Sequence, residues 1–205
     1  MWERIERDTG QDQLPPPFWA FPWAGGQALA RYLLDQPDCV RGRVVLDLAS
    51  GSGLVAIAAA AAGAASVTPS DTDPLAVAAI TLNAGVNRVR LQPTVGDLLS
   101  APGPGEPGPG EPGPGGPGQK AGAPVRADVV LAGDAFYDRD MAGLMLPFLE
   151  RASQAGALVL VGDPGRAYLP RERFTQVTTY DVPVERVIED ADVKPTTVWR
   201  LSDPE

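Results

Sequence analysis

Four aspartates fall where buried strands are expected to end, and this repeated placement is the main chemical signal in the sequence. Asp47, Asp71, Asp97 and Asp134 lie at or beside the carboxyl ends of four predicted strands. In a parallel sheet those ends meet at one edge, and ligands bind there near the switch in strand order. We therefore expect the four carboxylates to surround one binding site.

The expected ligand follows from what each strand end offers. Gly51 and Gly53 permit a tight turn into a helix, and the amides of that turn and helix N-terminus favour an anionic group such as a carboxylate. Asp71 is placed to accept hydrogen bonds from a ribose diol, and Asp97 from an adenine amino group. Together these groups describe a nucleoside that carries an amino acid.

A competing pattern covers the same turn. Residues 51–56 also match the G-x-G-x-x-A fingerprint of dinucleotide-binding proteins, with Asp71 at about the expected distance downstream. Asp47 favours the amino-acid nucleoside, because a carboxylate beside the turn repels a pyrophosphate and attracts an ammonium group. The absence of histidine also counts against a dehydrogenase, although tyrosine or lysine can serve as proton donor.

The composition excludes several other chemistries. The 205 residues include no histidine and one cysteine, Cys39. Imidazole-dependent nucleophiles, His-ligated zinc, internal disulfides and thiolate metal cages are therefore excluded, and no metal site is expected. A formal charge of −9 disfavours binding to nucleic acid. The first residues are charged where a signal peptide is apolar, and no apolar run is long enough to cross a bilayer, so we expect a cytoplasmic protein without membrane contact.

Strands and helices alternate along most of the chain. Asp73 suits the N-cap of a helix that begins at Pro74, and we interpret Asn83 and Asn87 as residues that end it. This order predicts one α/β domain over residues 1–205, a Rossmann-like, doubly wound, mostly parallel seven-stranded sheet with helices on both faces. The expected strands are residues 44–48, 67–71, 91–95, 127–132, 157–161, 174–182 and 196–201, and the main helices are residues 54–62, 74–83 and 141–152.

Two segments depart from this alternation. Residues 101–124 hold 8 prolines and 9 glycines in an EPGPG repeat, with no aliphatic side chain larger than alanine. Such a segment cannot offset the entropy of becoming ordered, so it is predicted to be a disordered insertion. Residues 14–37 form an aromatic N-terminal lead-in followed by a helix. Its aromatic side chains suit either core packing or a ligand platform, and composition alone does not decide between these roles.

Several motifs carry a resemblance to a known family. The segment VVLDLASGSG resembles motif I of the class I, seven-β-strand S-adenosylmethionine-dependent methyltransferases, with Ala49 in place of the first glycine. The segments PPPFWAFPWAGGQALARYLL, SVTPSDTDPLAVAAITLNAGVN, GDAFYD and TTVWRL resemble the protein-lysine methyltransferases that include the electron-transfer-flavoprotein β-subunit lysine methyltransferase. The resemblance covers nearly the whole chain apart from the Pro/Gly-rich insertion.

The resemblance implies S-adenosylmethionine as the cofactor and assigns its contacts. Asp71 would hold the ribose hydroxyls, and Asp97 with Leu98 would face the adenine. Asp47 would lie near the ammonium group of the methionine moiety. The remaining implied cofactor contacts are Gly51, Ser52 and Gly53 along the methionine moiety and Trp23 over the cofactor from the N-terminal side.

The resemblance also implies the reacting side of the site. The D-x-x-Y element contributes Asp134 and Tyr137 as catalytic residues at the mouth through which a target lysine enters. Asp134 would position the amine rather than act as a strong base, since a carboxylate also stabilises the ammonium form. Tyr137, Phe136 and Trp23 would form walls that exclude water.

The implied partner is a protein with an accessible lysine, such as the electron-transfer-flavoprotein β subunit or a ribosomal protein. Two other functions remain open at this point. One is methylation of a small amine or heterocyclic nitrogen. The other is a catalytically silent nucleotide-binding partner protein, which the alanine at position 49 slightly favours.

Overall fold

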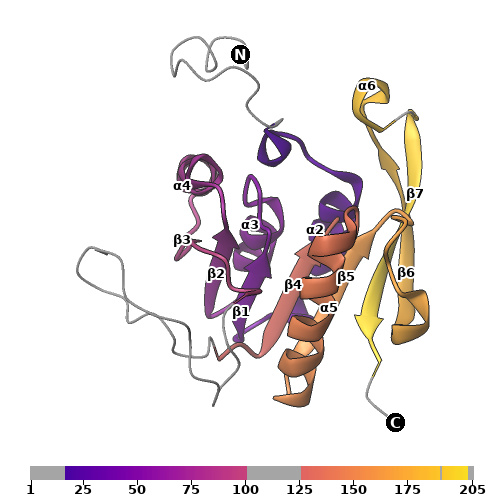
Figure 1. Cartoon of the computed structure of the whole chain (residues 1–205). Helices are drawn as coiled ribbons and strands as arrows, with labels where there is room; N and C mark the ends of the chain where they lie inside the picture. Colours follow the sequence, from indigo (N-terminus) through magenta and orange to yellow (C-terminus); the bar gives the residue numbers. More distant parts are fainter. Residues whose placement is uncertain (1–16, 101–125, 190, 203–205) are drawn as a thin grey trace.

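One seven-stranded sheet organises the molecule, seen in a computed structural model that describes residues 17–100, 126–189 and 191–202 (Figure 1). The strand order is β3-β2-β1-β4-β5-β7-β6. Neighbours from β3 to β5 pair in parallel, whereas β7 is antiparallel to both β5 and β6. The predicted doubly wound, mostly parallel sheet is confirmed. The strands are β1 (Val44–Leu48), β2 (Ser66–Asp71), β3 (Thr94–Val95), β4 (Val129–Gly133), β5 (Leu158–Asp163), β6 (Phe174–Pro183) and β7 (Val193–Leu201).

Helices cover both faces of the sheet. Alternate residues of β4 separate the two layers, as period-two side-chain direction requires. Val129 and Leu131 pack in a core with α2 (Ala24–Asp35) and α3 (Leu54–Ala61). Val130 and Ala132 pack in a second core with α5 (Arg139–Gln154). Figure 1 shows α5 on the opposite side of the sheet from α2 and α3.

The helix that follows β2 is α4 (Pro74–Asn87), and it begins where the sequence predicted. The Asp73 side chain accepts a hydrogen bond from the Leu75 amide at 2.8 Å, which satisfies one of the free donors of the first turn. The helix continues past Asn83 to Asn87 and ends at Arg88, which adopts a left-handed φ of 56°. The interpretation of Asn83 as a terminating residue is therefore wrong.

Other connections are short or lie outside the described residues. β3 is two residues long rather than the five expected, because Pro93 has no amide to donate to the ladder. The remaining short elements are the 3₁₀ turns η1 (Phe18–Ala20), η2 (Pro37–Cys39) and η3 (Arg171–Arg173) and helix α6 (Arg186–Glu189). The predicted disordered insertion, residues 101–124, lies outside the described residues. Among the described helices, none is long and apolar enough to cross a membrane.

Candidate functional site

The turn that joins β1 to α3 is built from residues with left-handed backbone. Ala49, Gly51 and Gly53 have φ values of 48°, 57° and 84°. Glycine adopts this conformation without steric cost, whereas an alanine there is strained. The Gly53 amide donates to the Ser50 carbonyl at 2.9 Å, and the Ser50 amide donates to the Ser70 carbonyl at 3.0 Å, so the turn is held against the end of β2.

Asp47 lies under this turn and is 1% exposed. Its Oδ2 accepts hydrogen bonds from the Ser50 hydroxyl and from the Ala56 amide, the latter at 3.1 Å. Its Oδ1 is buried and has no hydrogen-bond partner among the described residues. Burial raises the pKa of Asp47 to about 7, although the Ser50 and Ala56 hydrogen bonds oppose the shift. A buried acceptor without a donor suits a ligand that brings a positive charge or an N–H group.

Asp71 fixes the same turn from the end of β2. Its Oδ2 accepts from the Gly51 amide at 2.9 Å, and its Oδ1 accepts from the Asp73 amide at 3.0 Å. The side chain is half-buried. Asp71 therefore stands beside the glycine turn with both oxygens oriented and with lone pairs left to accept further hydrogen bonds.

The cleft above the turn collects five of the ten predicted site residues: Trp23, Asp47, Gly51, Ser52 and Asp134. Gly53, the last residue of the turn, does not line the cleft and faces α4, where an added Cβ would meet Ile80 at 3.2 Å. The other residues that line the cleft are Phe18, Phe21, Pro22, Gly26, Ala49, Ser50, Leu54, Val55 and Gly133.

Asp71, Asp97, Leu98 and Tyr137 do not line this cleft. Asp97 is exposed after β3, and its Oδ1 accepts from the amides of Leu99 at 3.0 Å and Ser100 at 3.1 Å. Hydrogen bonds from Ser100, opposed by partial burial, lower the pKa of Asp97. Leu98 packs against the core on the α5 side of the sheet.

An aromatic cluster closes one side of the cleft. The Trp23 indole N–H donates to the Phe18 carbonyl at 2.7 Å. The ring centre of Phe18 lies 6.1 Å from that of Trp23 and 6.0 Å from that of Tyr137. Tyr137 thus reaches the cluster from the turn after β4, while half of its surface stays exposed.

Phe136 does not contribute to a wall of this site. Its side chain is fully buried, and its ring centre lies 5.9 Å from that of Phe174 in the core. The expectation that Phe136 excludes water from the site is therefore wrong. The reason is backbone direction, since Asp134 has a left-handed φ of 53° and the next two residues, Ala135 and Phe136, pack in the core on the α5 side of the sheet.

Asp134 is buried and held by donors from two elements. Its Oδ2 accepts from the Gly26 amide in the first turn of α2 at 3.0 Å. Its Oδ1 accepts from Arg166, at 3.1 Å from Nε and 2.7 Å from Nη2. Burial raises the pKa of Asp134 to about 6, against the opposing effect of the Arg166 charge.

The close approach of α2 to the strand ends needs glycines on both sides. A Cβ added to Gly25 would lie 2.2 Å from the Gly162 carbonyl oxygen and 2.5 Å from Asp134 Oδ2. A Cβ added to Gly133 would lie 2.8 Å from the Gly26 Cα. These glycines bring the amide of Gly26 within reach of the Asp134 carboxylate.

The sequence prediction missed the residues that surround Asp134 on its other side. Arg166 follows β5, and its guanidinium pairs with Glu189 of α6 as well as with Asp134. The one signal available was the segment GDPGR after a predicted strand, which indicates a turn at the same sheet edge. Nothing in the sequence marked Glu189. Asn83 was also missed as a contact, and its side-chain amide donates to the Ser52 carbonyl at 2.8 Å.

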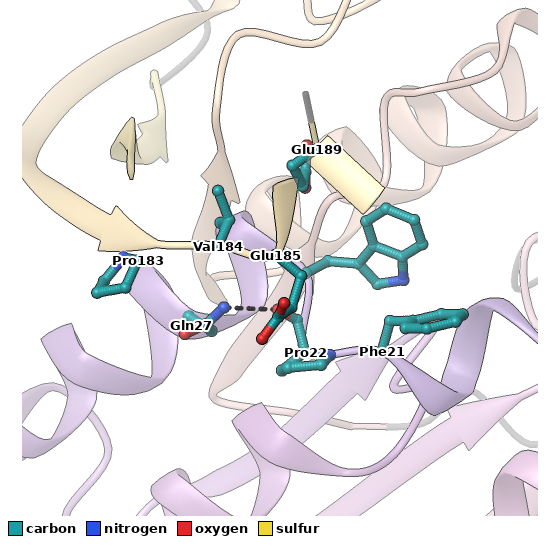
Figure 2. Close-up of a pocket in the computed structure, with 8 residues that line it drawn as sticks. Phe21, Pro22, Gln27, Pro183, Val184, Glu185 and Glu189 are labelled. Carbon is teal, nitrogen blue, oxygen red and sulfur yellow. Dashed lines mark hydrogen bonds between the residues drawn. The ribbon is translucent and has the colours of Figure 1, made fainter. Parts of the chain in front are cut away.

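A second recess lies beside the cleft, between the aromatic lead-in and the segment between β6 and α6 (Figure 2). Trp23 lines both hollows. In Figure 2 the Gln27 side chain points to the Pro22 carbonyl, to which it donates at 2.6 Å. The recess is lined by Phe21, Pro22, Trp23, Gln27, Pro183, Val184, Glu185 and Glu189.

The cleft as a whole fits an amino-acid nucleoside with a positive charge. The unpartnered oxygen of Asp47 offers an acceptor for an ammonium group, and the glycine turn keeps side chains out of the ligand's path. The described part of the chain has no group of three or more acidic, cysteine or histidine side chains placed to hold a metal ion.

Comparison with known proteins supports this fit. Residues 28–103 match the family described as ribosomal protein L11 methyltransferase (PrmA). The proteins named electron transfer flavoprotein beta subunit lysine methyltransferase from Rattus norvegicus and Homo sapiens are each 35% identical to this chain, over 203 and 204 residues. The alignments cover 97% of this chain and 70% and 68% of those proteins.

Solved structures share the fold at lower identity. The magnesium protoporphyrin IX methyltransferase from Synechocystis PCC 6803, with bound S-adenosylmethionine, superposes with a TM-score of 0.58 at 14% identity and covers 98% of this chain and 91% of that one. The 16S rRNA N2 G1207 methyltransferase of T. thermophilus superposes with a TM-score of 0.57 at 19% identity, over 94% of this chain and 44% of that one.

Proposed function

This chain belongs to the electron transfer flavoprotein beta subunit lysine methyltransferase family and is an S-adenosylmethionine-dependent methyltransferase, and we propose that it methylates lysine side chains of a protein. The first candidate substrate is the electron transfer flavoprotein beta subunit, which the names of the relatives specify. The observation that carries the proposal is the buried Asp134 carboxylate, oriented at the mouth of a cleft suited to the cofactor.

Residues of the β1, β2 and β3 ends would hold the cofactor. Asp47 would accept from its ammonium group, the turn at Gly51, Ser52 and Gly53 would line its methionine moiety, and Asp71 would hold the ribose. Asp97 and Leu98 would contact the adenine, and Trp23 would cover the cleft. The cofactor supplies a methyl group already activated by a sulfonium centre, so the protein has only to align the acceptor nitrogen with it.

The acceptor side of the site is assigned to Asp134 and Tyr137. Asp134 would accept a hydrogen bond from the lysine nitrogen and fix its direction of approach, since both of its oxygens are already oriented by Gly26 and Arg166. Lysine reacts only as the neutral amine, whose conjugate acid has an ordinary pKa of about 10.4. A carboxylate stabilises the charged form, so Asp134 serves to position the amine and the proton leaves to water.

The aromatic side chains would limit the entry of water. Phe18, Trp23 and Tyr137 form a continuous cluster beside Asp134. Burying the alkyl part of the lysine against these rings would contribute hydrophobic free energy and would leave only the nitrogen near a polar group. The negative charge of the protein, −9, also favours a cationic substrate segment.

The test uses purified substrate and a labelled methyl donor. The wild-type enzyme, D134A and the exposed control D140A are incubated with S-adenosylmethionine carrying a deuterated methyl group and the electron transfer flavoprotein beta subunit. Peptide mass spectrometry is expected to find label on lysine with the wild type and D140A, and a loss of at least about 100-fold in rate with D134A. Label confined to small molecules, or D134A with the wild-type rate, would contradict the proposal.

Ribosomal protein L11 is the second candidate substrate, because the match over residues 28–103 is to a family described by that protein. The same assay with L11 in place of the flavoprotein subunit distinguishes the two. A rate that is higher with L11 would reassign the substrate without changing the assigned site.

A further inference from the structure

We propose that Arg166 is a positioning residue for methyl transfer, because it holds the Asp134 carboxylate at the mouth of the cleft and connects it to Glu189 of α6. The inference rests on the proposed function, in which Asp134 contacts the lysine nitrogen. It adds a residue from the loop after β5 that neither the sequence motifs nor the family comparison identifies.

The geometry of the Arg166–Asp134 pair fixes the carboxylate. Arg166 donates from Nε at 3.1 Å and from Nη2 at 2.7 Å, and both bonds end on Oδ1. Oδ2 is held from the opposite side by the Gly26 amide at 3.0 Å. The carboxylate plane is therefore set by rigid backbone on one side and by a planar guanidinium on the other. Oδ1 already accepts two hydrogen bonds, whereas Oδ2 accepts one and keeps a lone pair for the substrate.

Three further elements hold Arg166 itself. Asp163, at the end of β5, accepts from the amides of Gly165 at 2.6 Å and Arg166 at 2.7 Å, which shapes the turn. Glu189 accepts from Nη1 at 3.3 Å and from Nη2 at 2.8 Å. The guanidinium carbon lies 5.6 Å from the ring centre of Trp23. The direction of this arginine is thus determined by β5, α6 and the N-terminal lead-in together.

Arg166 is needed to keep the Asp134 carboxylate ionised, because burial and the nearby carboxylates oppose its negative charge. The charges of Arg166 and Asp163 both act on Asp134. Glu189 pairs with the guanidinium, Lys194 of β7 pairs with Glu189, and Asp47 lines the same cleft. Burial raises the pKa of Asp134 to about 6, and the Arg166 charge opposes that rise. Without it, burial and the remaining carboxylates would favour the protonated form near neutral pH.

Stability alone gives little reason for this arrangement. The Asp134 and Arg166 side chains are only 7% and 19% exposed, and the desolvation of such a pair offsets most of its attraction. A role in positioning the substrate explains why the Arg166–Asp134 pair lies at the opening of the cleft. Glu189 also lines the recess of Figure 2, so a substrate segment entering there would contact the residue that anchors Arg166.

The direct test measures the ionisation of Asp134 without substrate. Carbon-13 NMR follows the labelled aspartate carboxyls through a pH titration of the wild type, R166Q, R166K and the control R173Q, with D134N used to assign the signal. Removing a cation at this distance is expected to raise the pKa of Asp134 by about 1–3 pH units in R166Q. R166K and R173Q are expected to stay near the wild type. An unchanged pKa in R166Q would overturn the proposal.

The kinetic test separates charge from orientation. With the lysine substrate, kcat/KM is expected to fall more steeply with decreasing pH once Asp134 becomes protonated, and this change of slope should occur at a higher pH in R166Q than in the wild type. The Kd for S-adenosylmethionine should change by less than about twofold. If R166Q does not fold, the R166K variant provides the test of the proposal, since lysine keeps the charge but cannot reproduce the two-donor contact. We expect its kcat/KM to fall by at least about tenfold, and a wild-type value would overturn the proposal.

These measurements keep the two proposals apart. Wild-type enzyme that transfers no methyl group to lysine would contradict the proposed function, and the NMR titration would still decide whether Arg166 controls Asp134. Methylation by the wild type together with an unaltered titration in R166Q would leave the function standing and remove Arg166 from the site.

Discussion

Replacing Asp47 with asparagine is expected to make the stability of the free enzyme less dependent on pH. Asp47 is 1% exposed, and burial raises its pKa to about 7 from an ordinary value of 3.8. A carboxyl with a higher pKa in the folded state binds more protons there than in the unfolded chain. The free energy of unfolding must therefore fall as the pH rises from about 4 through about 7.

The size of this effect follows from the same values. Each pH unit in that window changes the free energy of unfolding by about 1.4 kcal/mol, so the Asp47 contribution falls by roughly 2–3 kcal/mol between about pH 5 and pH 8. The pKa of Asp134 is raised to about 6 and that of Asp163 is raised as well, both mainly by burial. Both contribute in the same direction in wild type and variant, so the difference between the two proteins isolates Asp47.

Urea unfolding followed by tryptophan fluorescence at the two pH values provides the assay. Between about pH 5 and pH 8, the free energy of unfolding of D47N is expected to fall by about 2–3 kcal/mol less than that of the wild type. The exposed control D140N is expected to match the wild type. D47N should also bind S-adenosylmethionine at least about tenfold more weakly at pH 8, because a charge-assisted hydrogen bond is lost. A D47N protein with the wild-type pH dependence would refute the reasoning.

Three further substitutions, two of them paired with a control variant, test the turn and the helix packing around it. D71A is expected to weaken S-adenosylmethionine binding by at least about tenfold in calorimetry, whereas D73A should lower the free energy of unfolding by about 0.5–2 kcal/mol and leave the Kd unchanged. Equal affinity in D71A and wild type would remove that residue from the site. G25A is expected to lower the free energy of unfolding by about 3 kcal/mol or more, because its Cβ would lie 2.2 Å from a backbone oxygen. G143A, with no atom within 4 Å of the added Cβ, should stabilise α5 by about 0.5–1 kcal/mol. Thermal unfolding checks both, and similar melting temperatures would contradict the packing argument. A49G is expected to raise the free energy of unfolding by up to about 1 kcal/mol, since it removes a side chain from a left-handed position, and a less stable variant would count against strain at that residue.

The sheet and the first half of the cleft could be predicted because both depend on local pattern. Short apolar strands ending in aspartate, followed by glycine or proline turns, determine where the carboxyl ends lie. The structure accordingly brings Asp47, Gly51 and Ser52 into one cleft. Asp73 was predictable for the same reason, because a cap depends on residues two or three positions away.

The other half of the site depends on contacts that no local pattern contains. Arg166 meets Asp134 across 32 residues, and it meets Glu189 across 23. The approach of α2 to β5 depends on Gly25 facing Gly162, which is a tertiary match between two separate glycines. Phe136 was misplaced because the left-handed backbone of Asp134 redirects the residues that follow. These features arise from packing of distant elements and become visible only in three dimensions.

A crystal structure of the enzyme with S-adenosylhomocysteine and a lysine-containing substrate peptide tests the account most directly. We expect the amino group of the ligand on Asp47, its ribose on Asp71, and the lysine nitrogen within hydrogen-bond distance of Asp134 while Arg166 still contacts that carboxylate. A lysine that enters from another side of the cleft, without contacting Asp134, would contradict it.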